Sequence, residues 1–90
     1  NNRDLVAEQI ESFLISNGSF DGRNRPDRET ELFDSGYVDS LGIVRLIDFL
    51  ETTFSVLLGD EELLDERFPT INGMTCAVER ARERDDAVAR

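Results

Sequence analysis

The sequence predicts an all-α fold, a small four-helix bundle with three main helices, one short helix and a long first loop. Three segments have apolar residues at intervals of three and four, which places those residues on one face of a helix. The connecting segments are rich in glycine and charged residues, which favour loops. Ninety residues make a single domain, 1–90, for which we expect an ordered core of about 4–84.

The first helix is expected over about 4–16, followed by a long loop over 17–39. Asp4 is a candidate N-cap, and Asn17-Gly18 is a stop signal. The inward face of this helix consists of four apolar residues: Val6, Ile10, Phe13 and Leu14. A loop this long in a compact domain is usually functional or anchored. Its candidate anchors to the core are five apolar residues: Phe20, Leu32, Phe33, Tyr37 and Val38.

Two further main helices are expected, over 40–54 and about 70–84, with a short helix or turn between them over about 60–66. The apolar face of the second helix has Leu46 and Phe49 beside it and consists of Ile43, Val44, Ile47, Leu50 and Phe54. Thr70 is the candidate N-cap of the last helix. The inner face of that helix consists of Ile71, Met74, Ala77, Val78 and Ala81. We expect a frayed or helical tail after it.

The chain is strongly acidic, with ten Lys and Arg against twenty Asp and Glu and a net charge of −10. This balance argues against nucleic acid and anionic membranes as partners, because both need a basic surface. It favours a protein partner with a basic docking patch, although solubility explains the same acidity equally well. All ten basic residues are arginine, which we interpret as codon bias.

The one cysteine, Cys76, cannot form an intrachain disulfide, so a reducing cytoplasm is the simplest setting. We interpret it as a small, half-buried helix residue rather than a redox centre. No apolar run reaches transmembrane length, and the N-terminus is not a signal peptide. The expected protein is therefore cytoplasmic and monomeric.

Asp39-Ser40-Leu41 ends the long loop and opens the second helix. This places the Ser40 hydroxyl at a helix N-terminus, where the free N–H groups and the helix dipole favour a phosphate. The residues alone leave two interpretations. Ser40 is either a plain helix N-cap or the attachment point of a phosphodiester-linked group, with Asp39 as a polar residue before the cap.

The chain resembles the acyl carrier and peptidyl carrier protein family in seven residues: Asp39, Ser40, Leu41, Val44, Leu46, Leu50 and Phe54. The similarity runs from about Leu5 to about Arg82. It implies an acyl-carrier-protein-like fold and a protein that is not itself an enzyme. It also implies a 4'-phosphopantetheine group, donated by coenzyme A and attached to Ser40. Asp39 then helps the modifying transferase and its metal to engage.

The resemblance further implies a freestanding carrier that presents an acyl or aminoacyl thioester to other enzymes. Its partners are then a phosphopantetheinyl transferase, an acyl- or aminoacyl-loading ligase, and downstream synthase or tailoring enzymes. In the family these enzymes meet the exposed face of the second helix. The matching positions here are Leu41, Arg45, Asp48, Glu51 and Thr52.

Two residues depart from the pattern of fatty-acid carriers. Arg45 stands where an acidic residue is common, and Gly42 weakens the first helical turn by up to about 1 kcal/mol relative to Ala. These departures favour polyketide or nonribosomal peptide metabolism, including antibiotic biosynthesis, over fatty-acid synthesis, and an aminoacyl cargo stays open. Arg45 has a second interpretation without a partner role, an ion pair with a nearby carboxylate. The candidates are Asp34, Asp39, Asp48 and Glu51.

Two other function classes compete with the carrier. An unmodified acidic helical adaptor would bind a basic protein without any chemistry at Ser40. A hydrolase that uses Ser40 is disfavoured, because the chain has no histidine to activate a serine. No metal site is predicted, since an acidic cluster without an EF-hand pattern is best interpreted as a solvated face. The cluster consists of Asp60, Glu61, Glu62, Asp65 and Glu66.

Overall fold

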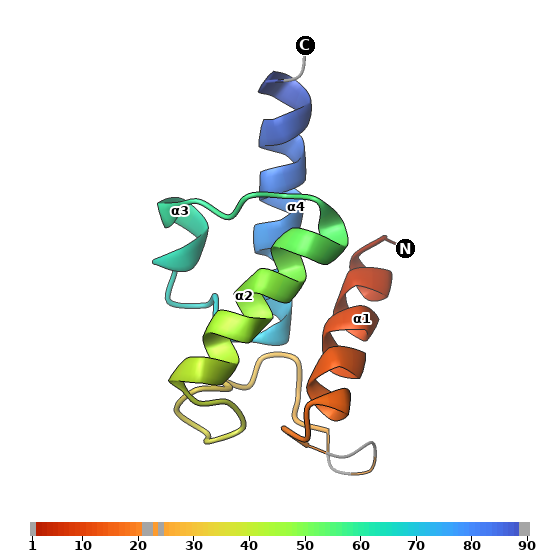
Figure 1. Cartoon of the computed structure of the whole chain (residues 1–90), viewed down its shortest axis with the longest axis vertical. Coiled ribbons are helices and arrows are strands. Elements are labelled where there is room, and N and C mark those ends of the chain that lie inside the picture. Colours follow the sequence, from red (N-terminus) through yellow and green to blue (C-terminus); the bar gives the residue numbers. More distant parts are fainter. Residues whose placement is uncertain (1, 21–22, 24, 89–90) are drawn as a thin grey trace.

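The computed structural model of the chain describes residues 2–20, 23 and 25–88. These residues contain four helices and no strand: α1 (Asn2–Ser16), α2 (Ser40–Phe54), α3 (Asp60–Leu63) and α4 (Ile71–Val88). Figure 1 shows α2 in front of α4, with α1 on one side and the short α3 on the other. α1 runs antiparallel to α2 and packs against α4. The predicted all-α bundle with three main helices and one short helix is confirmed.

The bounds of the helices follow their capping residues. α2 has the predicted range. α1 begins before Asp4, so this residue lies in the first helical turn and the prediction that it is the N-cap is wrong. The Thr70 hydroxyl accepts a hydrogen bond from the Gly73 N–H at 2.8 Å, which confirms Thr70 as the cap of α4. α4 is helical through Val88, and the rest of the predicted tail, 89–90, lies outside the described residues.

The core lies where α1, α2 and α4 meet and includes side chains from the loops. Its fully buried members come from all three helices and from the first loop, and they include Ile10, Leu14, Leu32, Leu46, Leu50, Ile71, Met74 and Val78. The predicted inner face of α4 is buried at every position. None of the helices within the described ranges is long and apolar enough to cross a membrane.

The inward face of α2 differs from the prediction. The buried residues of this helix are Leu46, Leu50 and Phe54, whereas Val44 is 61% exposed. Apolar residues occupy more than half of the circumference of α2, so their spacing leaves the centre of the buried face undetermined. Val44 therefore belongs to the outer surface of the helix, one turn after Ser40.

Gly73 allows the start of α4 to pack against the preceding turn. A Cβ atom at this position would lie 1.7 Å from the backbone oxygen of Arg67. Real Cβ atoms do not approach an oxygen so closely, so any other residue would force the turn and the helix apart.

Candidate functional site

Ser40 is the first residue of α2, and its side chain is exposed. The hydrogen bonds found at this helix N-terminus belong to Asp39, and none of those among the described residues uses the Ser40 hydroxyl. The hydroxyl is therefore accessible and takes part in no hydrogen bond that stabilises this part of the described structure.

Asp39 is the N-cap of α2. Its backbone is extended, its Oδ1 atom accepts a hydrogen bond from the Gly42 N–H at 2.7 Å, and its carbonyl accepts one from Ile43 at 2.9 Å. The interpretation of Ser40 as a plain N-cap is therefore wrong, as is that of Asp39 as a residue before the cap. A short carboxylate reaches the N3 amide and satisfies one of the free donors of the first turn.

Gly42 has a local packing role beside this cap. A Cβ atom here would lie 3.2 Å from Asp39 Oδ1 and 3.3 Å from Val38 Cβ, closer than most Cβ contacts. Glycine thus lets the capping carboxylate close onto the helix. This packing accounts for Gly42 without reference to any pathway.

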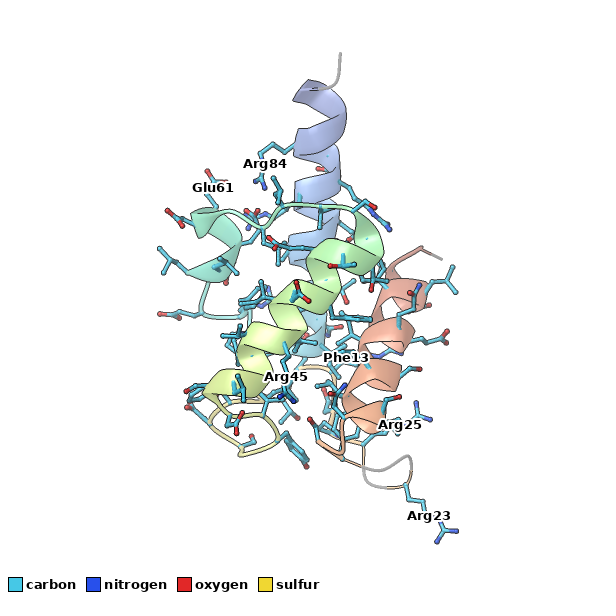
Figure 2. All side chains as sticks on the ribbon, viewed as in Figure 1. Phe13, Arg23, Arg25, Arg45, Glu61 and Arg84 are labelled. Carbon is cyan, nitrogen blue, oxygen red and sulfur yellow. The ribbon has the colours of Figure 1, made fainter. Side chains whose placement is uncertain are left out.

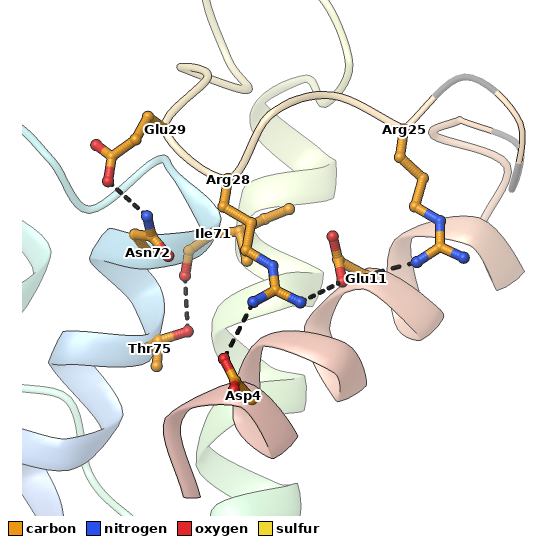
Figure 3. Close-up of polar contacts among 8 residues, drawn as sticks. All are labelled: Asp4, Glu11, Arg25, Arg28, Glu29, Ile71, Asn72 and Thr75. Carbon is orange, nitrogen blue, oxygen red and sulfur yellow. Dashed lines mark hydrogen bonds and ion pairs between the residues drawn. The ribbon is translucent and has the colours of Figure 1, made fainter. Parts of the chain in front are cut away.

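The loop before Ser40 is tied to α1 by Arg28. The guanidinium donates hydrogen bonds to Glu11 at 3.2 Å and to Asp4 at 3.4 Å (Figure 3). The hydrogen bond with Glu11 is the main cause that raises the pKa of Arg28. Glu11 has a side chain only 7% exposed, and Arg25 lies 3.9 Å from the same carboxylate. Two arginines of the loop thus neutralise a buried charge on α1.

The same loop is also tied to the segment that leads into α4. The Leu32 N–H donates to the Pro69 carbonyl at 2.8 Å, and the Asn72 N–H donates to the Arg28 carbonyl at 3.0 Å. Leu32, Phe20 and Val38 are buried, which confirms them as anchors. Tyr37 is half-buried and meets Phe20 edge to face.

One predicted anchor, Phe33, is wrong, because it is 44% exposed. It stands next to Leu32, which fills the core position, so Phe33 is left on the outside of the loop. The other contacts of the first loop, with α1 and with the start of α4, fix the position of Asp39 and therefore of the start of α2.

The residues predicted to form a partner face differ in their exposure to solvent. Leu41, Arg45, Asp48 and Thr52 are exposed on α2. Glu51 is half-buried, and its carboxylate accepts a hydrogen bond from the Leu58 N–H at 2.9 Å, so it serves to hold the segment after α2. The exposed Val44 was not assigned to the partner face from the sequence. Its position four residues after Ser40 was the one sequence feature that indicated this assignment.

A groove of about 300 Å³ opens beside Ser40, between the end of α1, the first loop and the start of α2. We call it the Ser40 groove. Its lining consists of Phe13, Leu14, Asn17, Gly18, Ser19, Gly36, Tyr37, Val38, Asp39, Leu41, Gly42 and Arg45. Ser40 itself lies outside this lining, but both of its neighbours in sequence belong to it.

Arg45 makes no ion pair with any carboxylate among the described residues. The interpretation that it pairs with Asp34, Asp39, Asp48 or Glu51 is therefore wrong. Figure 2 shows Arg45 between α2 and α1, near Phe13. Arg45 also lines the Ser40 groove, so its exposed side chain is available there to an external acceptor.

The acidic cluster around α3 is not uniformly solvated. Asp60, Glu61, Asp65 and Glu66 are exposed, but Glu62 is 1% exposed and pairs with Arg84 at 2.7 Å. The interpretation of Glu62 as a surface charge is therefore wrong. In the described residues no three His, Cys, Asp or Glu side chains are arranged to hold a metal ion. Cys76 is half-buried on α4, as predicted, and has no disulfide.

Residues 20–77 match the family model described as "Phosphopantetheine attachment site". The match covers more than half of the chain, and the chain belongs to this family.

A relative is the "Probable acyl carrier protein PigG" of Serratia sp. (strain ATCC 39006). The two chains are 37% identical over 54 residues, which are 60% of this chain and 62% of the length of the curated relative. No solved structure matches the chain significantly.

The chain therefore contains a carrier domain, and the cofactor of this family is covalently bound 4'-phosphopantetheine. The start of α2 fits such a group. Among the described residues the exposed Ser40 hydroxyl has no hydrogen-bond partner, and the groove beside it is lined by Arg45, which has no ion-pair partner among them. Carriers of this family act together with a transferase and with synthetic enzymes.

Proposed function

We propose that Ser40 is the residue that bears the 4'-phosphopantetheine arm. The observation that supports this proposal is that the helix cap at the start of α2 is Asp39 and not Ser40. Asp39 caps the helix, so the Ser40 hydroxyl is exposed and can be esterified without loss of a structural hydrogen bond. The N-terminus of α2 stabilises the negative charge of the resulting phosphodiester.

The modification is a phosphoryl transfer that a separate transferase catalyses. Ser40 Oγ bonds to the phosphorus of the pantetheine phosphate, the diphosphate P–O bond of coenzyme A breaks, and adenosine 3',5'-bisphosphate leaves. The serine proton passes to a base of the transferase. Asp39 lies next to the reacting hydroxyl and supports the transferase and its metal. When bound, the arm supplies a terminal thiol that forms a thioester with the cargo.

We further propose that the cargo is an acyl or aminoacyl intermediate of polyketide or nonribosomal peptide metabolism. The support is Arg45, which departs from the acidic pattern of fatty-acid carriers. Gly42 no longer supports this choice, because its packing against Asp39 and Val38 explains it. The partners are then a loading ligase and downstream synthase or tailoring enzymes.

The proposed partner surface consists of Leu41, Val44, Arg45, Asp48 and Thr52, all exposed on α2. Val44 replaces the predicted Glu51, whose carboxylate is engaged inside the molecule. Leu41 and Val44 are apolar and 58% and 61% exposed, so they gain most from burial against a partner.

The experiment that tests Ser40 is intact-mass analysis after incubation with coenzyme A, Mg²⁺ and a broad-specificity phosphopantetheinyl transferase. We expect a gain of one phosphopantetheine in the native chain and in Ser35→Ala, a control in the exposed part of the loop. Ser40→Ala should gain nothing. Modification of Ser40→Ala would move the attachment site elsewhere. No gain in the native chain with a validated transferase would favour the unmodified adaptor.

A further inference from the structure

The Ser40 groove has a composition that suits a polar, tethered occupant. Its wall on α2 includes Arg45 and Leu41, and its wall on the first loop includes Asn17, Ser19 and Tyr37. These side chains offer hydrogen-bond donors and acceptors together with apolar surface. A volume of about 300 Å³ is large enough for a flexible segment of a small ligand.

Arg45 distinguishes this groove from the rest of the surface. Every other arginine in the described part of the chain has a carboxylate, a carbonyl or an aromatic ring as a partner, or another interaction within the chain. Arg45 alone among them has none, although the chain has a net charge of −10. A guanidinium that finds no partner among so many carboxylates is available to an acceptor that comes from outside the fold.

We infer that the Ser40 groove is the resting site of the phosphopantetheine arm and that Arg45 holds the arm there by donating to its oxygen acceptors. This inference rests on the proposed attachment to Ser40. The arm offers a phosphate, two amide carbonyls and a hydroxyl, which suit the donors of the groove. The arm extends from Ser40, and the residues on either side of Ser40 in the sequence, Asp39 and Leu41, both line the groove.

The tether favours this occupant over a free molecule of similar chemistry. A group attached at the edge of a groove has an effective concentration of the order of millimolar with respect to it, so weak contacts suffice for binding. Arg45 is then a positioning residue: it keeps the thiol end near the carrier until a partner enzyme engages α2. Because Arg45 also belongs to the proposed partner surface, a partner that contacts it would release the arm.

Two measurements on the whole chain test the inference. The first is the change of amide chemical shifts between the unmodified and the phosphopantetheinylated protein. Gly18 is the sharp reporter, because it lines the groove and is far from Ser40 in sequence. The second is the rate at which a thiol reagent reacts with the arm. Cys76→Ser in all proteins removes the other thiol.

We expect the Gly18 amide to shift on modification and to return toward its unmodified position in Arg45→Gln. The thiol of Arg45→Gln should react about tenfold faster, the change expected from loss of one charge-assisted hydrogen bond. Arg45→Lys should fall between the two. Arg80→Gln, the same substitution at an exposed residue of α4, should behave like the parent protein.

An unchanged Gly18 amide in a protein whose mass shows full modification would overturn the inference and leave the proposed attachment intact. Equal thiol rates in the parent protein and Arg45→Gln would remove Arg45 as the residue that holds the arm. Absence of any mass gain would instead defeat the proposed function itself.

Discussion

Glu62 and Arg84 form a bidentate ion pair that joins α3 to α4. Arg84 Nη2 lies 2.7 Å from Glu62 Oε1, and Nη1 lies 3.2 Å from Oε2. The same guanidinium donates to the Leu57 carbonyl at 3.0 Å, and Glu62 accepts the Gly59 N–H at 3.0 Å. Figure 2 shows Arg84 extending from α4 toward α3. The short α3 is thus held by one buried carboxylate and the arginine that neutralises it.

This pair predicts a specific pH dependence of stability. The hydrogen bond from Arg84, supported by the Gly59 N–H, lowers the pKa of Glu62 despite burial. A lowered pKa means that the folded state gains stability above the unfolded value of about 4.3 and loses it as the pH falls through the folded value. The free energy of unfolding of Glu62→Gln should therefore lie below that of the native chain at pH 5–7, and the gap should shrink below about pH 4.

Urea denaturation at several pH values measures this gap. Glu61→Gln is the matched control, because Glu61 is exposed in the same helix, and its curve should follow the native one. A gap of constant size from pH 7 to pH 3 would contradict the assignment of the pH dependence to Glu62. Arg84→Ala should lose about 2 kcal/mol at pH 7, because it leaves a buried carboxylate without its main partner.

Substitutions at Asp39 separate its capping role from its charge. Asp39→Ala should lower the free energy of unfolding by about 1 kcal/mol, since it removes the acceptor for the Gly42 N–H. Asp39→Asn keeps an acceptor and should be nearly as stable as the native chain. If the carboxylate also assists the transferase, Asp39→Asn will be phosphopantetheinylated more slowly than the native chain, although its stability is nearly unchanged. Equal stability of the alanine and asparagine variants would argue against the cap.

Arg28 should be important for stability although it lies in a loop. Arg28→Ala leaves the buried Glu11 carboxylate with Arg25, at 3.9 Å, as its remaining ion-pair partner among the described residues, so we expect a loss of about 1–3 kcal/mol. Arg67→Ala is the control, because Arg67 and Glu29 are both exposed and 3.8 Å apart. Its effect should stay within about 0.5 kcal/mol. Chemical denaturation compares the two, and equal losses would refute the role of the buried charge.

Gly73→Ala should be more harmful than the same substitution at Gly42, although both residues are in helices. At residue 73 the new Cβ atom would lie 1.7 Å from a backbone oxygen, which cannot move without the turn. At residue 42 its nearest neighbour is a side-chain oxygen at 3.2 Å, which can adjust. We expect a loss of about 2 kcal/mol or more at Gly73 and a smaller effect at Gly42. Thermal melting of both variants checks the order.

Val44→Ser should weaken a partner interaction without weakening the fold. The side chain is exposed one turn after Ser40, so the variant should unfold within about 0.5 kcal/mol of the native chain. Loss of its apolar contact should lower kcat/KM for phosphopantetheinylation by up to about tenfold. Leu57→Ser, another exposed apolar residue in the segment after α2, is the control and should leave kcat/KM unchanged. Equal values for all three proteins would exclude Val44 from the surface.

Local features of the sequence were sufficient to predict four helices and the position of Ser40, although α3 ends at Leu63 and not at about residue 66 as predicted. The apolar spacing and the Asp39-Ser40 junction lie within α2 or next to it, so its range follows from neighbouring residues. The family resemblance likewise depends on Asp39-Ser40-Leu41 and the apolar residues that follow in α2, and the comparison confirms the family.

Features that depend on distant residues could not be predicted in this way. Burial of Glu62 depends on Arg84, and the position of the first loop depends on Arg28 meeting Glu11. The necessity of Gly73 depends on where the Arg67 carbonyl points. Each is a tertiary contact, and nothing in the local pattern distinguishes these residues from exposed charges or an ordinary helical glycine.

The chemical nature of the basic side chains has a consequence for a thioester held on Ser40. Thioesters acylate free amines and thiols, so a carrier risks being acylated by its own cargo. In this chain every basic side chain is a guanidinium, which stays protonated and does not act as a nucleophile. The one thiol, Cys76, is half-buried on α4 and does not line the Ser40 groove. The groove thus offers the activated cargo neither an amine nor a thiol to acylate.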